Sequence, residues 1–222
     1  MNYQLIIFDL DGTLLDTLED LGEAVNQALE RRGFPLHGPA EYRRMVGHGV
    51  RNLVTQALPE ERQGDEGLID ECLADFKAYY TKHIAVHTRP YPGMCELLAD
   101  LHGAGALLAV VSNKFQSGTE VLIRTFFPGI PFVAIFGNRP GAPLKPDPAL
   151  VGEVLRLAGV ERNEAVLVGD SGTDMLTARN GGIRGIAVSW GYRPMSPSPD
   201  HSVVSTADEL RELFLSNNTK PK

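Results

Sequence analysis

The sequence predicts an α/β fold with a doubly wound parallel sheet as its core and a helical segment inserted after the first strand. Short apolar runs recur along the chain, and continuous runs of this kind are typical of strands buried on both faces of a parallel sheet. Helical patterns separate these runs, as they do in βαβ units. Residues 17–87 differ, because they contain helical patterns and no convincing buried strand.

Six apolar runs are assigned as strands. The four clearest cover residues 3–10, 107–113, 165–170 and 185–190, and two weaker ones cover residues 131–137 and 201–205. The helical pattern of residues 149–157 begins after Pro148 and stops at Gly159, an order that suits the first turn and the end of a helix. Similar patterns cover residues 94–101 and begin at residue 174.

The inserted stretch has four helical segments, at residues 18–32, 39–46, 50–58 and 67–84. We therefore predict an α/β core domain of residues 1–16 and 88–222 and a helical cap domain of residues 17–87. Residues 193–200 are rich in proline and serine and are predicted to form a surface loop.

The composition is that of an ordinary soluble globular protein, with 43% hydrophobic and 22% charged residues among 222. The net charge of −7 gives no electrostatic reason to expect nucleic acid as a partner. Cys72 and Cys95 lie far apart, so we expect two reduced thiols. The sequence shows no signal peptide and no membrane-spanning stretch, so we expect a cytoplasmic protein without a membrane partner.

Polar, reactive residues follow three of the predicted strands. Asp9 and Asp11 end the first strand, Ser112 and Asn113 end the second, and Asp170 ends the third. Ligands of open α/β sheets bind at the carboxyl ends of the strands, so these side chains are expected to share one site.

The segment DLDGT at residues 9–13 predicts a metal and phosphate site. In an extended chain, Asp9 and Asp11 lie on the same side, where their charges repel unless a cation neutralises them. Mg²⁺ prefers such oxygen ligands. Gly12 permits a tight turn and close ligand approach, and Thr13 offers a hydroxyl and an amide to a phosphate. The alternative is an Asp-Gly turn with solvated carboxylates.

Three further residues are candidates for the same site. Asp170 would supply a third carboxylate, and Asp174 would cap the following helix or support the metal ligands, two compatible roles. Lys145, between proline-rich turns, could balance the carboxylates and hold a phosphate oxygen, although a lone lysine is more often a surface residue.

In chain order, DLDGT, Ser112 in VVSNK, Lys145 in LKPDP and GDSGTD at residues 169–174 resemble the four motifs of the haloacid dehalogenase-like hydrolase superfamily. The resemblance runs from Asp9 to about Trp190 and implies a Rossmann-like core. The insert between the first two motifs resembles the helical cap of that superfamily.

Within the superfamily, the chain is most similar to phosphoglycolate phosphatases. The segments LLDTLEDL at residues 14–21 and VGHGVRNLV at residues 46–54 support this similarity. It implies that the loop of residues 47–49 reaches over the active site. His48 and Arg51 could then meet a substrate carboxylate. The alternative for Arg51 is a solvated helix residue.

The resemblance implies hydrolysis of a phosphate monoester through an aspartyl phosphate, with 2-phosphoglycolate as the expected substrate. Asp9 would be the nucleophile, and Asp11 would protonate the leaving group and then activate water. Mg²⁺ would be held by Asp9, the Asp11 carbonyl and Asp170. The phosphate would be bound by Gly12, Thr13, Ser112, Asn113 and Lys145.

Other readings of the sequence stay open at this point. The same scaffold could carry a pyrophosphatase, a nucleotidase, a sugar-phosphate phosphatase or a β-phosphoglucomutase-like enzyme acting on another small phosphorylated metabolite. A non-catalytic binding module is disfavoured because Asp9 and Asp11 are both present. A metal-free dehalogenase is disfavoured because Asp170 accompanies them. We expect a monomer or a homodimer.

Overall fold

Six parallel strands form the central sheet of the structure, a computed structural model that describes residues 3–216. The strand order is β5-β4-β1-β6-β7-β8, and the predicted parallel sheet is confirmed. The strands are β1 Leu5–Phe8, β4 Leu107–Phe115, β5 Phe132–Asn138, β6 Ala165–Gly169, β7 Arg184–Val188 and β8 His201–Val204. In register, Leu5 pairs with Leu107 on one side and with Ala165 on the other, so β1 lies at the centre.

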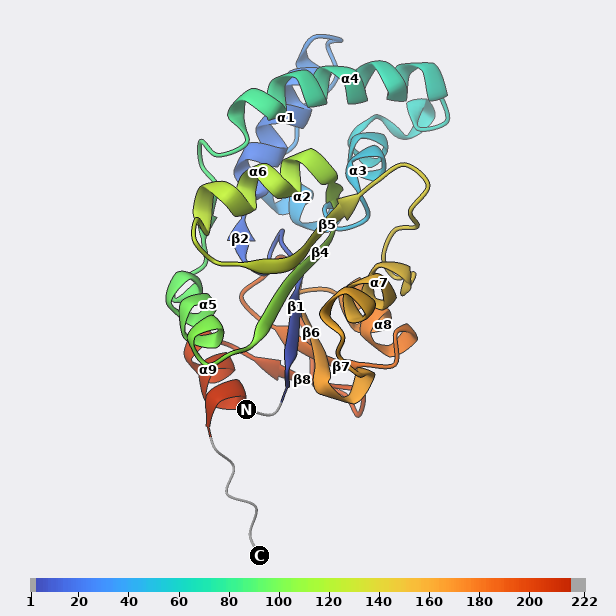
Figure 1. Cartoon of the computed structure of the whole chain (residues 1–222). Coiled ribbons are helices and arrows are strands. Elements are labelled where there is room, and N and C mark those ends of the chain that lie inside the picture. Colours follow the sequence, from blue (N-terminus) through green and yellow to red (C-terminus); the bar gives the residue numbers. More distant parts are fainter. Residues whose placement is uncertain (1–2, 217–222) are drawn as a thin grey trace, which may run out of the picture.

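Helices cover both faces of this sheet, which makes it doubly wound (Figure 1). Ile6 and Phe8 belong to a core cluster shared with α5 (Met94–Gly103), α6 (Gln116–Phe126) and α9 (Ala207–Leu215). Leu5 and Ile7 face the opposite way and pack with α7 (Ala149–Ala158) and α8 (Gly172–Asn180). The alternation along β1 therefore divides the apolar interior into two layers.

Two helices of the core, α6 and α9, were not predicted from the sequence. Helix α6 starts directly after β4, and its N-cap, Phe115, makes no side-chain hydrogen bond, so no start signal marks it. Helix α9 does carry such a signal, because the side chain of Thr206 accepts a hydrogen bond from the amide of Glu209. That pattern could have been recognised from the sequence.

The inserted stretch forms four α-helices close to the predicted segments. They are α1 Leu18–Glu30, α2 Pro39–Met45, α3 Val50–Ala57 and α4 Glu66–His83. They stand beyond the carboxyl ends of the central strands (Figure 1). Helices α1 and α4 bury apolar residues at helical spacing against each other, among them Val25 and Phe76.

A small two-stranded sheet joins the insert to the core, a feature that the sequence did not predict. Strand β2 (Leu15–Asp16) pairs antiparallel with β3 (Arg89–Pro90), so the chain enters and leaves the insert at adjacent points. Asp20 strengthens this junction by accepting hydrogen bonds from the amides of His87 and Thr88 and from the Thr88 hydroxyl. We propose that this junction marks the boundary between the predicted core and cap domains.

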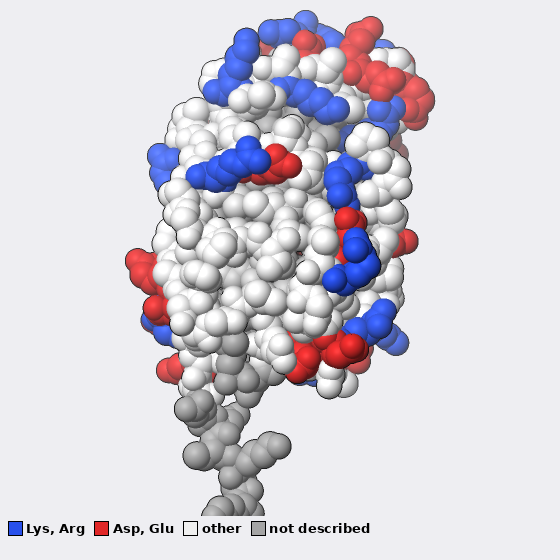
Figure 2. Space-filling view, viewed as in Figure 1, with Lys and Arg blue, Asp and Glu red and all other residues white. Residues whose placement is uncertain are grey.

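Cys72 is buried, Cys95 is exposed, and both are free thiols. Among residues 3–216, no helix combines the length and apolar character needed to cross a membrane. Figure 2 shows that the middle of one face is largely uncharged, with side chains of both signs spread around it.

Candidate active site

A pocket lies at the carboxyl ends of β1, β4 and β6, beneath the helices of the insert. Six of the predicted site residues line it, namely Asp9, Asp11, Ser112, Asn113, Lys145 and Asp170. The opposite wall is mainly apolar and comes from the insert, including Leu21, Leu53 and Phe76. The prediction that three strand ends deliver polar groups to one place is confirmed.

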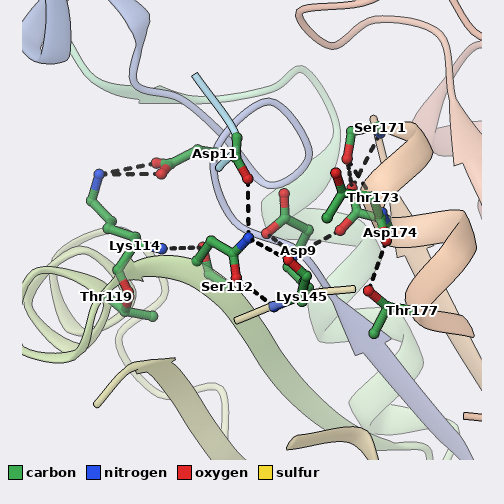
Figure 3. Close-up of polar contacts among 12 residues, drawn as sticks. Asp9, Asp11, Ser112, Lys114, Thr119, Lys145, Ser171, Thr173, Asp174 and Thr177 are labelled. Carbon is green, nitrogen blue, oxygen red and sulfur yellow. Dashed lines mark hydrogen bonds and ion pairs between the residues drawn. The ribbon is translucent and has the colours of Figure 1, made fainter. Parts of the chain in front are cut away.

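Lys145 joins two carboxylates at the floor of the pocket (Figure 3). Its Nζ donates to Asp9 Oδ1 at 2.7 Å and to Asp174 Oδ1 at 2.6 Å. Burial lowers the pKa of Lys145, but the neighbouring charges of Asp174 and Asp9 outweigh burial and raise it above its usual value. Lys145 therefore carries a fixed positive charge directly beside Asp9, and it is not a surface lysine.

Asp170 is enclosed by backbone at close range. The amide of Tyr192 donates to Asp170 Oδ2 at 2.8 Å. A Cβ atom on Gly12 would lie 2.3 Å from the same oxygen, and one on Gly191 would lie 2.2 Å from the Asp170 Cβ. Gly12 also has a positive φ of 87°. Glycine at position 12 thus meets the predicted need for a tight turn, and it admits Asp170 as well.

The pocket floor holds more negative charge than Lys145 can balance. Oxygens of Asp9, Asp170 and Asp174 lie within 4.8 Å of one another. Burial, followed by repulsion from Asp174 and Asp170, raises the pKa of Asp9 to about 8 despite Lys145. Burial and the charge of Asp174 raise the pKa of Asp170 to about 7. A buried set of oxygen donors with excess negative charge fits a hard divalent cation.

The contacts of Asp174 separate its role from those of Asp9 and Asp170. One oxygen accepts from Lys145, and the other accepts from the amide and hydroxyl of Ser171. Ser171 is the N-cap of α8, and Asp174 completes a capping box with it. Asp9 and Asp170 each keep one oxygen that accepts no hydrogen bond from the described residues.

Asp11 lies in a second polar cluster on the other side of the pocket (Figure 3). Its Oδ1 accepts from the Thr17 hydroxyl at 2.7 Å and from Lys114 Nζ at 3.1 Å. Lys114 is buried and stacks over the ring of Tyr80 at 4.7 Å. Lys114 was not predicted as a site residue, although two-residue alternation places it on the same side of β4 as Ser112.

Two predicted phosphate ligands of the second motif differ in their contacts. The Ser112 Oγ accepts a hydrogen bond from the Lys114 amide at 3.2 Å, which leaves its own proton free to donate. The side chain of Asn113 instead donates to the carbonyls of Gly47 and Lys145 and accepts from the Lys145 amide at 2.8 Å. Asn113 therefore positions the Lys145 loop and is not arranged as a phosphate ligand.

The amides expected to bind phosphate from the first motif are already used. The Gly12 amide donates to the Leu15 carbonyl at 2.9 Å, and the Thr13 amide donates to the Leu10 carbonyl at 3.2 Å. The turn that brings Gly12 against Asp170 consumes both donors. The hydroxyl of Thr13 is buried and has no hydrogen-bond partner among residues 3–216.

His48 and Arg51 are not brought into the pocket, although their neighbours Gly47, Gly49 and Val50 line it. Arg51 forms ion pairs with Glu66 and Asp70 instead. Arg51 pairs with these residues because it lies in the first turn of α3, which faces the start of α4, and both acidic residues lie there. A substrate contact from either residue stays a prediction that this arrangement does not support.

The loop after β7 contributes two residues that the sequence analysis missed. The Tyr192 hydroxyl accepts from the Thr17 amide at 2.7 Å, and Arg193 lines the pocket. Arg193 Nη2 donates to the carbonyl oxygens of Arg44 and Val46 in the insert. In the loop assigned to residues 193–200, Arg193 and Met195 are half-buried and the other residues are exposed.

The chain is similar to known proteins over almost its whole length. The family model described as haloacid dehalogenase-like hydrolase matches residues 6–188. A phosphoglycolate phosphatase from Mesorhizobium japonicum is 39% identical over 216 residues, which cover 95% of this chain and 94% of that protein. Phosphoglycolate phosphatase 1 from Pseudomonas aeruginosa is 35% identical, covering 95% of this chain and 78% of the relative.

A solved structure from Lactobacillus delbrueckii subsp. bulgaricus, described as a candidate phosphoglycolate phosphatase, has the same fold. Its TM-score is 0.88 at 34% identity, and the match covers 97% of this chain and all of that one. Likeness over the whole length includes the helical insert as well as the core.

Proposed function

This chain belongs to the haloacid dehalogenase-like hydrolase family, and we propose that it hydrolyses 2-phosphoglycolate through an aspartyl phosphate on Asp9. The observation that carries the chemistry is the pocket floor, where Lys145 lies 2.7 Å from Asp9 beside Asp170 and Asp174. The substrate is proposed from the names of relatives that match almost the whole chain. A small phosphorylated metabolite also suits a pocket that lies between the strand ends and the insert.

In the first half of the reaction, Asp9 attacks phosphorus and the bond from phosphorus to the glycolate oxygen breaks. Phosphoryl transfer depends mainly on positioning and charge neutralisation. Lys145 supplies both, because it holds one oxygen of Asp9 and presents its charge where the phosphoryl oxygens would lie. The free proton of Ser112 would donate to another phosphoryl oxygen.

Asp11 would donate the proton that the leaving glycolate oxygen takes up. In the second half it would remove a proton from water, which attacks phosphorus and releases phosphate and the Asp9 carboxylate. Thr17 and Lys114 hold Asp11 apart from the metal cluster, so the two carboxylates of the first motif can play different roles. Lys114 pairs with the charged form, which is the form needed in the second half.

Mg²⁺ is the proposed cofactor, held by the free oxygens of Asp9 and Asp170 and by the Asp11 backbone carbonyl. When bound, it would neutralise the repulsion between the Asp9 carboxylate and the phosphate. Asp174 would stay paired with Lys145 and Ser171 and orient the site from behind. The apolar wall from Leu21, Leu53 and Phe76 would exclude bulk water from the reacting atoms.

We expect Mg²⁺ to stabilise the protein more at alkaline than at acidic pH. Raised carboxyl pKa values mean that the metal-free folded state binds protons that the unfolded state has released. The free energy of unfolding of the metal-free protein therefore falls as pH rises from about 4 through about 8. Mg²⁺ replaces these protons, so its stabilising effect grows over the same range.

Thermal unfolding with Mg²⁺ or with EDTA, at about pH 5 and about pH 9, measures this effect. Asp170→Asn is the matched control, because it keeps the side-chain size but weakens the cation site, so the Mg²⁺-dependent shift should shrink. An equal Mg²⁺-dependent shift at both pH values would contradict the proposed exchange of protons for metal.

The proposed activity predicts Mg²⁺-dependent phosphate release, with 2-phosphoglycolate preferred over a sugar phosphate, pyrophosphate and a nucleotide. Measured kcat/KM values for this panel, each with an EDTA control, test the substrate. Preference for another ester would contradict 2-phosphoglycolate as the substrate but would still be consistent with the proposed mechanism. Activity that survives metal removal would contradict the cofactor. The cytoplasmic location and a monomeric or homodimeric state remain predictions.

A further inference from the structure

The pocket contains three cations, and two of them are already paired with carboxylates. Lys145 contacts Asp9 and Asp174, and Lys114 contacts Asp11. The third, Arg193, forms no ion pair with a carboxylate within residues 3–216. Its hydrogen bonds within the protein go to carbonyl oxygens, so no carboxylate contacts the guanidinium, although its charge also acts on the nearby Asp170.

Two hydrogen bonds hold the Arg193 guanidinium at the side of the pocket formed by the insert. Nη2 donates to the Val46 carbonyl at 2.6 Å and to the Arg44 carbonyl at 2.9 Å. Nη1 lies beside Gly47, where a Cβ atom would be 3.3 Å away. Gly47 is itself tied to the motif at the end of β4, because Asn113 donates to its carbonyl at 3.1 Å. The guanidinium thus stands between the insert and the phosphoryl site.

The backbone that carries Arg193 is fixed to the catalytic groups. The adjacent residue, Tyr192, donates its amide to Asp170 and accepts from the Thr17 amide through its hydroxyl. The position of Arg193 is therefore set relative to Asp170 and Asp11, the two carboxylates on either side of the proposed phosphoryl site. A side chain anchored in this way loses little further freedom when it binds an anion.

We propose that Arg193 binds the carboxylate of the substrate and so selects phosphorylated hydroxy acids over neutral phosphate esters. This inference rests on the proposed function. It identifies the residue that would bind the carboxylate, which is the second anionic group of the substrate. A guanidinium matches a carboxylate in geometry and charge. Arg51, the arginine suggested by sequence, is already neutralised by Glu66 and Asp70 and does not line the pocket.

A comparison of two substrates separates recognition from a structural role. 2-Phosphoglycolate carries the carboxylate, and ethyl phosphate has the same two-carbon skeleton without it. In Arg193→Met, kcat/KM for 2-phosphoglycolate should fall by about 10- to 100-fold, mainly through KM, because a charge-assisted hydrogen bond is lost. The value for ethyl phosphate should fall much less, because that ester has no carboxylate for Arg193 to bind. If Arg193 only held the insert, both values would fall together.

Further variants sharpen this test. Arg193→Lys keeps the positive charge but lacks the paired N–H donors of the guanidinium. It should therefore recover part of the preference for 2-phosphoglycolate over ethyl phosphate. Arg44→Met removes an exposed arginine near the same edge, whose side chain does not line the pocket, and should leave the preference intact. Thermal unfolding of each variant verifies that it is folded. Loss of preference in Arg51→Met but not in Arg193→Met would overturn the inference and restore the sequence-based candidate.

The outcomes for the wild-type protein distinguish the two proposals. A wild-type preference for 2-phosphoglycolate that survives in both Arg193 variants would overturn the role of Arg193 and leave the proposed function standing. A wild-type enzyme that hydrolyses both esters equally would overturn carboxylate selection while keeping the phosphatase chemistry. A wild-type protein with no Mg²⁺-dependent activity on any ester would overturn the proposed function and the inference that rests on it.

Discussion

Replacing Asp9 by asparagine should lower turnover by at least about 10⁴-fold, the scale seen when a covalent nucleophile is removed. The amide is nearly isosteric with the carboxylate, but it is a poor nucleophile and a weaker ligand for a hard cation. Phosphate release from 2-phosphoglycolate, followed over hours, measures the loss. Retained activity within an order of magnitude of wild type would contradict the covalent role of Asp9.

The same variant should remain folded, because the substitution removes a charge from a crowded acidic cluster. Burial, and then repulsion from Asp174 and Asp170, raises the pKa of Asp9. Without metal, Asp9→Asn should therefore unfold at a temperature no lower than wild type above about pH 8. A matched thermal unfolding curve separates the loss of chemistry from a loss of structure.

Replacing Asp11 by asparagine should produce a different defect that depends on the leaving group. General acid-base catalysis contributes about 10²- to 10⁴-fold, and 2-phosphoglycolate should lose it in both halves of the reaction. p-Nitrophenyl phosphate needs no proton on its leaving group, so Asp9 should still be phosphorylated. Hydrolysis of the aspartyl phosphate should then limit turnover, giving a burst of one p-nitrophenol per active site followed by a slow steady rate.

Rapid-mixing absorbance measurements test this burst, with wild type as the control that should show faster steady turnover. Thr17→Val should lower turnover less than Asp11→Asn does, because it removes one hydrogen bond to Asp11 but keeps the Asp11 carboxylate and its contact with Lys114. Equal steady rates for Asp11→Asn and wild type on both esters would exclude Asp11 as acid and base.

The sequence predicted the parallel sheet and most of the pocket floor for a simple physical reason. Parallel strands all end at one edge, so residues such as Asp9, Ser112 and Asp170 can be placed together once the strands are recognised. Lys145 could not be placed by this rule, because it lies in a loop, yet its proline-flanked motif marked it. The structure brings it into contact with Asp9.

The wall of the pocket was harder to predict, because it depends on how separate segments meet. Arg51 and Arg193 are both arginines near polar loops, and nothing in the sequence shows which one has acidic neighbours. The structure pairs Arg51 with Glu66 and Asp70 and leaves Arg193 facing the pocket. The partners of the Gly12 and Thr13 amides were hard to predict for a related reason, since their acceptors are defined only once the turn has formed.

Chemical identification of the phosphorylated residue tests the central claim most directly. The Asp11→Asn protein would be mixed with p-nitrophenyl phosphate and Mg²⁺, quenched in acid and treated with borohydride, which reduces an acyl phosphate to an alcohol. Peptide mass spectrometry should then find homoserine in place of aspartate at position 9, and none in Asp9→Asn treated alike. Reduction at another residue, or no reduction despite p-nitrophenol release, would contradict an aspartyl phosphate on Asp9.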